Sequence, residues 1–344
     1  MVIPKSSRPT LRGSSLHRLA LVFPALLAMG CDASPSPEDA EDAGASTQDL
    51  EDRIRTQLDA LDARTSFYAK HLPTGREVAI RADEPMNTMS TIKIPAMVLA
   101  YRDAEEQRLD LDARHEVRPA VLRRGTGLLQ TFDAGLSPTV RDLITQMIIT
   151  SDNTATDIVL DRVGLERVNA FLEDEGYEET RFRMITGDFF REIWIQVDSG
   201  HADLSHREVY EKGLPAGPDA QDHFFEMEGD SVRWLGRSTA REMGRLLEGI
   251  REASLASSES SEEMMGILER QLYSSRLPRY LLGRARVAHK TGDWAPIAGS
   301  DVGILLYDGG PAVVAAYTGQ NRGDFTDLER TLGRIAEALV DSWS

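Results

Sequence analysis

Strand-like segments lie near the two ends of this chain, and helical patterns fill the region between them. Two strands are predicted early, at Thr65–His71 and Arg76–Arg81. Three more are predicted late, at Arg286–Lys290, Val302–Tyr307 and Ala312–Tyr317. Early and late strands can share one sheet only if the helical middle forms a separate lobe, which predicts a functional site between the two parts.

The predicted fold class is therefore α+β. One domain, residues 50–344, is expected to hold a five-stranded antiparallel sheet flanked by helices, together with a helical lobe. The sheet part comprises residues 50–84 and 280–344, and the lobe comprises residues 85–279. A domain of this length is large enough to bury a substantial core.

The first 30 residues have the pattern of a signal peptide. Basic residues up to Arg18 precede an apolar run from Leu19 to Met29, which is too short to span a bilayer. Cys31 follows at once and resembles the lipidated cysteine of bacterial lipoproteins, with simple cleavage nearby as the alternative. Residues 31–49 are rich in Asp, Glu, Ala, Ser and Pro, and they are expected to form a disordered acidic linker. The expected location is the periplasm or cell envelope, with membrane contact only through a lipid at Cys31.

The charge of the chain excludes some partners. The formal net charge is −17, and it becomes −21 without the four basic residues of segment 1–30. Such an acidic body is a poor ligand for a phosphate backbone, so no nucleic-acid partner is expected. His201 and His206 are five residues apart with no obvious third ligand, so no metal and no cofactor are expected.

The first chemical motif is Ser90-Thr91-Ile92-Lys93 at the start of an apolar helical run. Residues three apart on a helix share one face, so the lysine amine can reach the serine hydroxyl. A serine becomes a good nucleophile only when a neighbouring base takes its proton, and a lysine can be that base if its pKa is lowered. This motif alone is also typical of an ordinary surface helix.

Two further motifs complete a set. Ser151-Asp152-Asn153 is predicted at a helix end, where it supplies a second hydroxyl and a carboxamide, or simply a helix cap. His289-Lys290-Thr291-Gly292 ends a predicted strand and supplies a cation and a hydroxyl, with Gly292 allowing substrate near the backbone. The three motifs occur in the order Ser-x-x-Lys, Ser-Asp-Asn and Lys-Thr-Gly. In this order the chain resembles class A β-lactamases and the penicillin-recognising serine hydrolases, from about Leu50 to the C-terminus.

The resemblance implies a role for each motif residue. Ser90 would be the acylated nucleophile, Lys93 its base or base partner, and Ser151 the proton donor to the leaving nitrogen. Asn153 would hold the acyl side chain, while Lys290 and Thr291 would bind the substrate carboxylate. The backbone N–H groups of Ser90 and Asp293 would form the oxyanion hole. The expected partner is a small β-lactam or a cell-wall peptide.

The chain departs from the family in one long segment. Class A enzymes carry Glu-x-x-Leu-Asn in a loop whose glutamate activates the deacylating water, and no such motif occurs here. Residues 183–237 form an insert in its place. Its candidate substitute bases, which could equally be solvated loop acids, are Asp188, Glu192, Glu226, Glu228 and Asp230.

A second departure is the acidic residue after the Lys-Thr-Gly motif. The carboxylate of Asp293 is expected near the anion site of Lys290 and Thr291, where a like charge opposes binding of a strongly anionic β-lactam. Three functions remain open: a β-lactamase-like hydrolase, a penicillin-binding peptidase that deacylates slowly, and a non-catalytic binding protein on the same fold. The retention of Ser90, Lys93, Ser151 and Lys290 argues against the last.

Overall fold

The computed structural model describes residues 37–133, 135–217 and 219–344. The predicted signal peptide and Cys31 lie outside these residues. The chain divides into a unit ending at Glu41 and a compact unit from Asp42 to Ser344, which holds the sheet and the helical lobe. No helix in the described ranges is both long enough and apolar enough to cross a membrane.

The first helix begins earlier than predicted. α1 spans Pro37–Asp59, whereas residues 31–49 were expected to form a disordered linker. Proline is favoured at the first helical position, acidic residues complement the positive end of the helix dipole, and alanine is a good helix former. The composition that suggested a linker therefore also suits the first turns of a helix.

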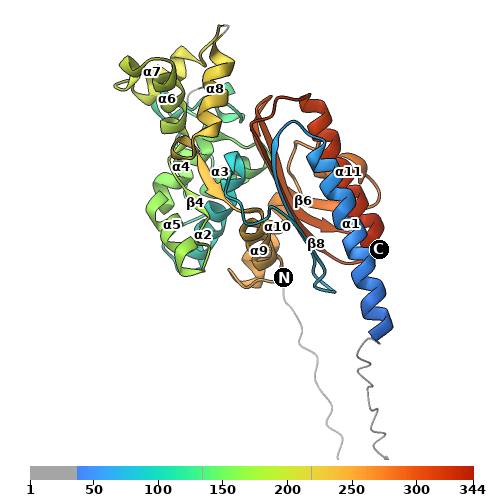
Figure 1. Ribbon diagram of the computed structural model, residues 1–344. Helices are drawn as coiled ribbons and strands as arrows, with labels where there is room; N and C mark the ends of the chain where they lie inside the picture. Colours follow the sequence, from blue (N-terminus) through green and yellow to red (C-terminus); the bar gives the residue numbers. More distant parts are fainter. Residues whose placement is uncertain (1–36, 134, 218) are drawn as a thin grey trace, which may run out of the picture. The chain divides into compact units, whose positions relative to one another are not determined.

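The main sheet confirms the predicted fold class. Its five strands are all antiparallel, in the order β2-β1-β8-β7-β6, so the first and last strands of the chain pair with each other (Figure 1). The strands span Arg64–His71 (β1), Glu77–Ile80 (β2), Arg286–Trp294 (β6), Ala298–Leu306 (β7) and Ala312–Gly319 (β8). Each predicted strand is present, and β6 extends four residues beyond its predicted end.

Helices cover both faces of this sheet. On β1, Phe67 and Ala69 pack into one apolar cluster and Tyr68 packs into the other, as the alternation of a strand requires. The first cluster lies against α1 and the C-terminal helix α11, which run side by side in Figure 1. The second joins the sheet to the helical lobe. The other α-helices are α2 (Lys93–Glu105), α3 (Val140–Ile149), α4 (Asn153–Val163), α5 (Leu165–Asp174), α6 (Thr186–Val197), α7 (His206–Lys212), α8 (Ala220–Gly229), α9 (Ala240–Arg251), α10 (Ser258–Leu268) and α11 (Phe325–Trp343).

A second small sheet was not predicted. Its order is β3-β5-β4, with bounds Met86–Asn87, Gly236–Ser238 and Arg181–Phe182. Segments of two or three residues are too short to show a period. Because Phe182 pairs with Gly236, the two ends of the insert lie side by side. The insert is therefore an excursion that leaves the lobe and returns at one place.

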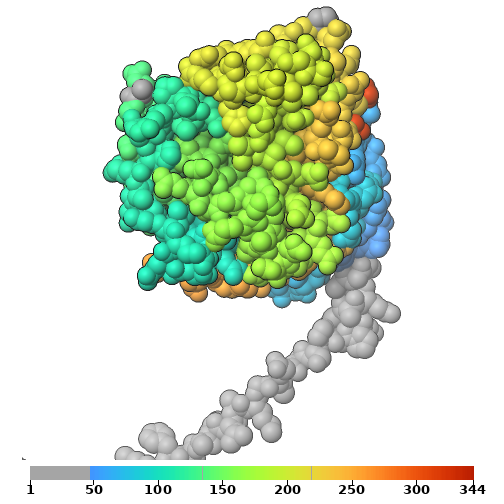
Figure 2. All heavy atoms as spheres, turned by 90° about the vertical axis from the view of Figure 1, so that its left-hand side faces the viewer, coloured from blue at the N-terminus to red at the C-terminus, as the bar shows by residue number. Residues whose placement is uncertain are grey.

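The insert forms a layer of three helices, α6, α7 and α8, next to α4. In Figure 2 its yellow residues gather along the top of the face shown, above the green and teal helical lobe. Glu228 on α8 joins the insert to the sheet: its carboxylate accepts a hydrogen bond from the backbone N–H of Gln320 at 2.9 Å, just after β8. Only 3% of Glu228 is exposed.

Glu228→Gln is expected to stabilise the protein at alkaline pH. Burial raises the pKa of Glu228 to about 7, so the folded state holds its proton more tightly than the unfolded state does. Stability therefore falls as pH rises from about 4.5 and levels off above about 7, with a total loss on the order of 3 kcal/mol. The uncharged amide removes this loss. Denaturant unfolding at pH 5 and pH 8.5 should show a gain only at the higher pH.

Glu226→Gln is the matched control for this prediction. Glu226 lies on the same helix, and its carboxylate bonds the exposed side chain of Gln196 at 3.2 Å. This variant should change stability little at either pH. An equal effect of Glu228→Gln at both pH values would show that titration of Glu228 does not control the stability of the fold.

Candidate active site

Ser90 lies in a short 3₁₀ turn rather than in the helix that follows it. The turn spans Met89–Ile92, and α2 begins directly afterwards at Lys93. Met89 has a φ of 46°, a left-handed conformation that costs a non-glycine residue about 1–3 kcal/mol and often marks functional sites. Ser90 is half-buried and lines a cavity of 140 Å³, so its hydroxyl is placed where a substrate can reach it.

Lys93 is completely buried beside the second motif. Its Nζ donates to the carbonyl oxygen of Ser151 at 2.8 Å and to Oδ1 of Asn153 at 2.8 Å. A longer contact of 3.2 Å joins it to Oγ of Ser151. Burial, assisted by the charge of Lys290, holds the pKa of the Lys93 amine well below its usual value. A neutral amine at working pH is what a general base requires.

The Ser-Asp-Asn motif spans a tight turn between two helices. α3 ends at Ile149, Ser151 adopts a left-handed φ of 55°, and α4 begins at Asn153. Asp152 caps α4 by accepting the N–H of Ala155 at 2.9 Å, so the capping role considered from sequence applies to this residue. The turn directs the Ser151 hydroxyl and the Asn153 carboxamide toward Lys93.

Lys290 completes the cluster from β6. It is fully buried, and its Nζ donates to Oγ of Ser151 at 3.0 Å and to the carbonyl oxygen of Thr291 at 2.7 Å. Burial lowers the pKa of Lys290 to about 7, although the Asp293 carboxylate acts in the opposite direction. The hydroxyl of Ser151 thus lies between two buried amines, an arrangement suited to moving protons.

The residues after Lys290 bring the strand close to Ser90. A Cβ on Gly292 would lie 2.5 Å from the carbonyl oxygen of Thr88, so glycine is required where β6 meets the nucleophile turn. This close contact gives Gly292 a reason other than the substrate approach predicted from sequence. The hydroxyl of Thr291 is buried and has no hydrogen-bond partner among the described residues. Such an unpaired donor is available to a ligand.

Asp293 lines the cavity, and its carboxylate is paired. It accepts a hydrogen bond from Arg276, a buried arginine that also donates to the carbonyl oxygen of Ser300 at 2.9 Å. The repulsion expected between Asp293 and a substrate anion is therefore offset by Arg276. No motif marked Arg276, because its partners lie on strands and helices distant in sequence.

The candidate deacylating acids do not line the cavity that holds Ser90. Asp188 pairs with His206 and Arg191, Glu192 pairs with Arg233, and Glu228 binds Gln320. Among the described residues that line the cavity, the only carboxylate is that of Asp293. The acids of the insert are thus structural in their contacts.

Sequence reasoning also missed the apolar side chains that close the cavity. Hereafter the apolar wall, they are Phe189, Phe190, Ile193, Leu214, Leu235 and Trp294. Thr186 lines the cavity too, and Asp157 on α4 fixes it by accepting its backbone N–H at 2.7 Å and its hydroxyl at 2.8 Å. A match to the family loop would have located this segment, but the insert carries no such motif.

The comparison with protein families decides the relationship. A model described as the beta-lactamase enzyme family matches residues 49–343. The chain belongs to the beta-lactamase enzyme family. The predicted resemblance to penicillin-recognising serine hydrolases is thereby confirmed, and with it a serine β-lactamase-like function.

Individual members of the β-lactamase family agree with this placement. The chain is 26% identical to a β-lactamase of Streptomyces fradiae, over 85% of this chain and 87% of that protein. The crystal structure of a β-lactamase from Sphaerobacter thermophilus DSM 20745 has a TM-score of 0.66 at 25% identity and covers 89% of this chain and 98% of its own. The penicillin-binding protein PBP-A, solved as an acyl-enzyme complex with penicillin G, has a TM-score of 0.65 at 21% identity, with 87% and 96% covered. That last likeness shows the fold alone.

Proposed function

We propose that Ser90 is acylated by β-lactams, and that the protein hydrolyses them as a β-lactamase of EC class 3.5.2.6. The observation that carries this proposal is the hydroxyl of Ser151, held between the buried amines of Lys93 and Lys290 at 3.2 Å and 3.0 Å. A buried proton-handling cluster beside a serine on a cavity wall is suited to acyl transfer.

Acylation begins with removal of the Ser90 proton. Neutral Lys93 accepts this proton as Oγ bonds to the lactam carbonyl carbon, and the developing oxyanion is held by the N–H groups of Ser90 and Asp293. The C–N bond of the lactam then breaks. The leaving nitrogen takes its proton from Ser151, whose hydroxyl is reprotonated by Lys93. Lys93 is thus neutral again when the acyl-enzyme has formed.

Deacylation requires a base for water, and the cavity favours Lys93 for this step too. Water gives a proton to Lys93 and its oxygen to the acyl carbon, and Ser90 regains a proton as it leaves. The shortage of carboxylates around the cavity supports a second candidate, a penicillin-binding peptidase that acts on cell-wall peptide and releases β-lactams slowly. We also propose export and lipid attachment at Cys31, which Cys31→Ala should abolish as release from the membrane fraction of the expressing cell.

One experiment separates these functions. Purified protein is mixed with benzylpenicillin and followed by intact mass, while a chromogenic cephalosporin reports turnover. A transient adduct with turnover supports hydrolysis, and a lasting adduct supports the slow peptidase. The absence of any adduct would refute acylation by β-lactams.

The pH dependence of kcat/KM should be bell-shaped around neutrality. The rising limb reports loss of the proton from Lys93, whose pKa lies well below its usual value. The falling limb reports loss of the cation that binds the substrate carboxylate, because the pKa of Lys290 is about 7. Steady-state rates from pH 5 to pH 10 check this. A rate that keeps rising above pH 8 would contradict a binding role for protonated Lys290.

A further inference from the structure

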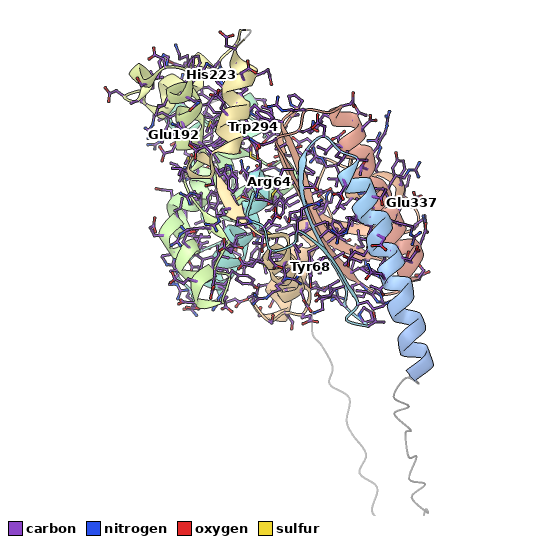
Figure 3. The ribbon with its side chains drawn as sticks, viewed as in Figure 1. Arg64, Tyr68, Glu192, His223, Trp294 and Glu337 are labelled. Atoms are coloured by element: carbon purple, nitrogen blue, oxygen red, sulfur yellow. The ribbon has the colours of Figure 1, made fainter. Side chains whose placement is uncertain are left out.

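The cavity beside Ser90 is walled mainly by large apolar side chains, and most of them come from the insert. Phe189, Phe190 and Ile193 lie on α6, Leu214 follows α7, and Leu235 precedes β5. Trp294 closes the wall from the end of β6, and Figure 3 shows it beside α8. A segment of this length with this composition gives the site a specific shape.

The apolar wall is held by ring contacts rather than left loose. Trp294 meets Phe189 edge to face at 5.3 Å between ring centroids, and it meets Phe224 of α8 at 5.8 Å. Phe189 meets Phe190 at 5.8 Å. At its start, α6 is fixed to α4 through the hydrogen bonds of Thr186 to Asp157. The wall is therefore present before a ligand arrives.

The cavity offers no partner to a charged group of a ligand. The Asp293 carboxylate is occupied by Arg276, and the described residues that line the cavity include no lysine, arginine or histidine. The carboxamide of Asn153 accepts from Lys93 and donates to the carbonyl oxygen of Arg124 at 2.8 Å. A charge placed against such a wall would lose its hydration without compensation.

The size and position of the cavity indicate which part of a substrate it holds. Its 140 Å³ is close to the roughly 150 Å³ of an apolar cavity able to bind benzene. Lys290 and Thr291 do not line it, whereas Ser90 and Asn153 do. A substrate whose carboxylate meets Lys290 and Thr291 would thus extend its acyl side chain toward the apolar wall.

We propose that the insert forms a subsite for a compact, uncharged aromatic group on the acyl portion of the substrate. This inference rests on acylation at Ser90, and it adds a substrate preference set by the apolar wall. Aromatic side chains would pack against Phe190 and Leu214. Acyl groups that carry a charge next to the ring would be disfavoured.

Three penicillins test this subsite. Benzylpenicillin carries an uncharged phenylacetyl group, carbenicillin carries the same ring with an added carboxylate, and 6-aminopenicillanic acid lacks the acyl group. The second-order rate constant of acylation is measured for each by intact mass. Benzylpenicillin should exceed both others by about tenfold or more.

Variants locate the preference. Phe190→Ala should lower the benzylpenicillin constant about tenfold and leave that of 6-aminopenicillanic acid within about twofold. Leu214→Ala, at a position 50% exposed, should act in the same direction without threatening the fold. Phe225→Ala is the matched control, since this half-buried ring of α8 packs under Arg322 and does not line the cavity.

The outcomes distinguish this inference from the function on which it rests. Equal constants for the three penicillins, or an equal loss for all three in Phe190→Ala and Leu214→Ala, would overturn the subsite while acylation stands. A failure of every penicillin to label the protein would overturn both. A preference lost in Phe190→Ala and kept in Phe225→Ala would establish the subsite.

Discussion

Ser90→Ala should abolish the covalent adduct with benzylpenicillin and reduce turnover by at least about 10⁴-fold. The substitution removes the only atom of the site that is placed to form the acyl bond, and it leaves the amines and the apolar wall in position. Since Ser90 is half-buried in a turn, loss of its hydroxyl should change the fold little. Intact mass and initial rates measure the two effects, and the thermal midpoint confirms folding.

Ser261→Ala provides the control for a lost serine hydroxyl. Ser261 lies on α10, and its buried hydroxyl has no hydrogen-bond partner among the described residues. This variant should acylate at the rate of the parent protein. Labelling that persists in Ser90→Ala would show that another residue is the nucleophile.

Lys93→Met should slow acylation by about 10³-fold while the protein stays folded. Methionine fills the same buried channel but cannot take the Ser90 proton. The loss should appear in the acylation rate constant rather than in substrate affinity, because Lys290 and Thr291 remain. The double variant Ser90→Ala/Lys93→Met should be no worse than Ser90→Ala, since the two residues act as one unit. Single-turnover acylation measured by mass supplies these rates.

The same substitution elsewhere gives the comparison. Lys70 on β1 pairs with Glu248 at 2.6 Å and does not line the cavity. Lys70→Met should leave acylation unchanged and cost at most about 1 kcal/mol of stability. Normal acylation in Lys93→Met would assign the base role to a different group, with Lys290 as the next candidate.

The main sheet could be predicted from sequence because its strands carry strong local signals. β1, β7 and β8 are rich in buried apolar or β-branched residues, and the turn before β8 contains glycine. The small sheet could not be predicted, because β3 and β4 have two residues each and depend on partners distant in sequence. The start of α1 was missed because acidic, alanine-rich segments suit both a linker and a helix.

The motif residues could be predicted as a group, but the contacts that adjust their chemistry could not. Ser90, Lys93, Ser151 and Lys290 do come together, as the order of the motifs indicates. Arg276 could not be inferred, since its pairing with Asp293 depends on how the segment after α10 crosses the end of β6. The apolar wall was hidden for a similar reason: its members come from four separate segments that meet only in the folded chain.

Peptide mapping of the benzylpenicillin adduct tests acylation at Ser90 most directly. Trypsin cleavage after Arg81 and Lys93 would release residues 82–93, in which Ser90 is the only serine and Thr88 and Thr91 are the other hydroxyl residues. Fragmentation of the labelled peptide should place the penicilloyl mass on Ser90. Label on Thr88, on Thr91 or on any other peptide would contradict the proposed nucleophile.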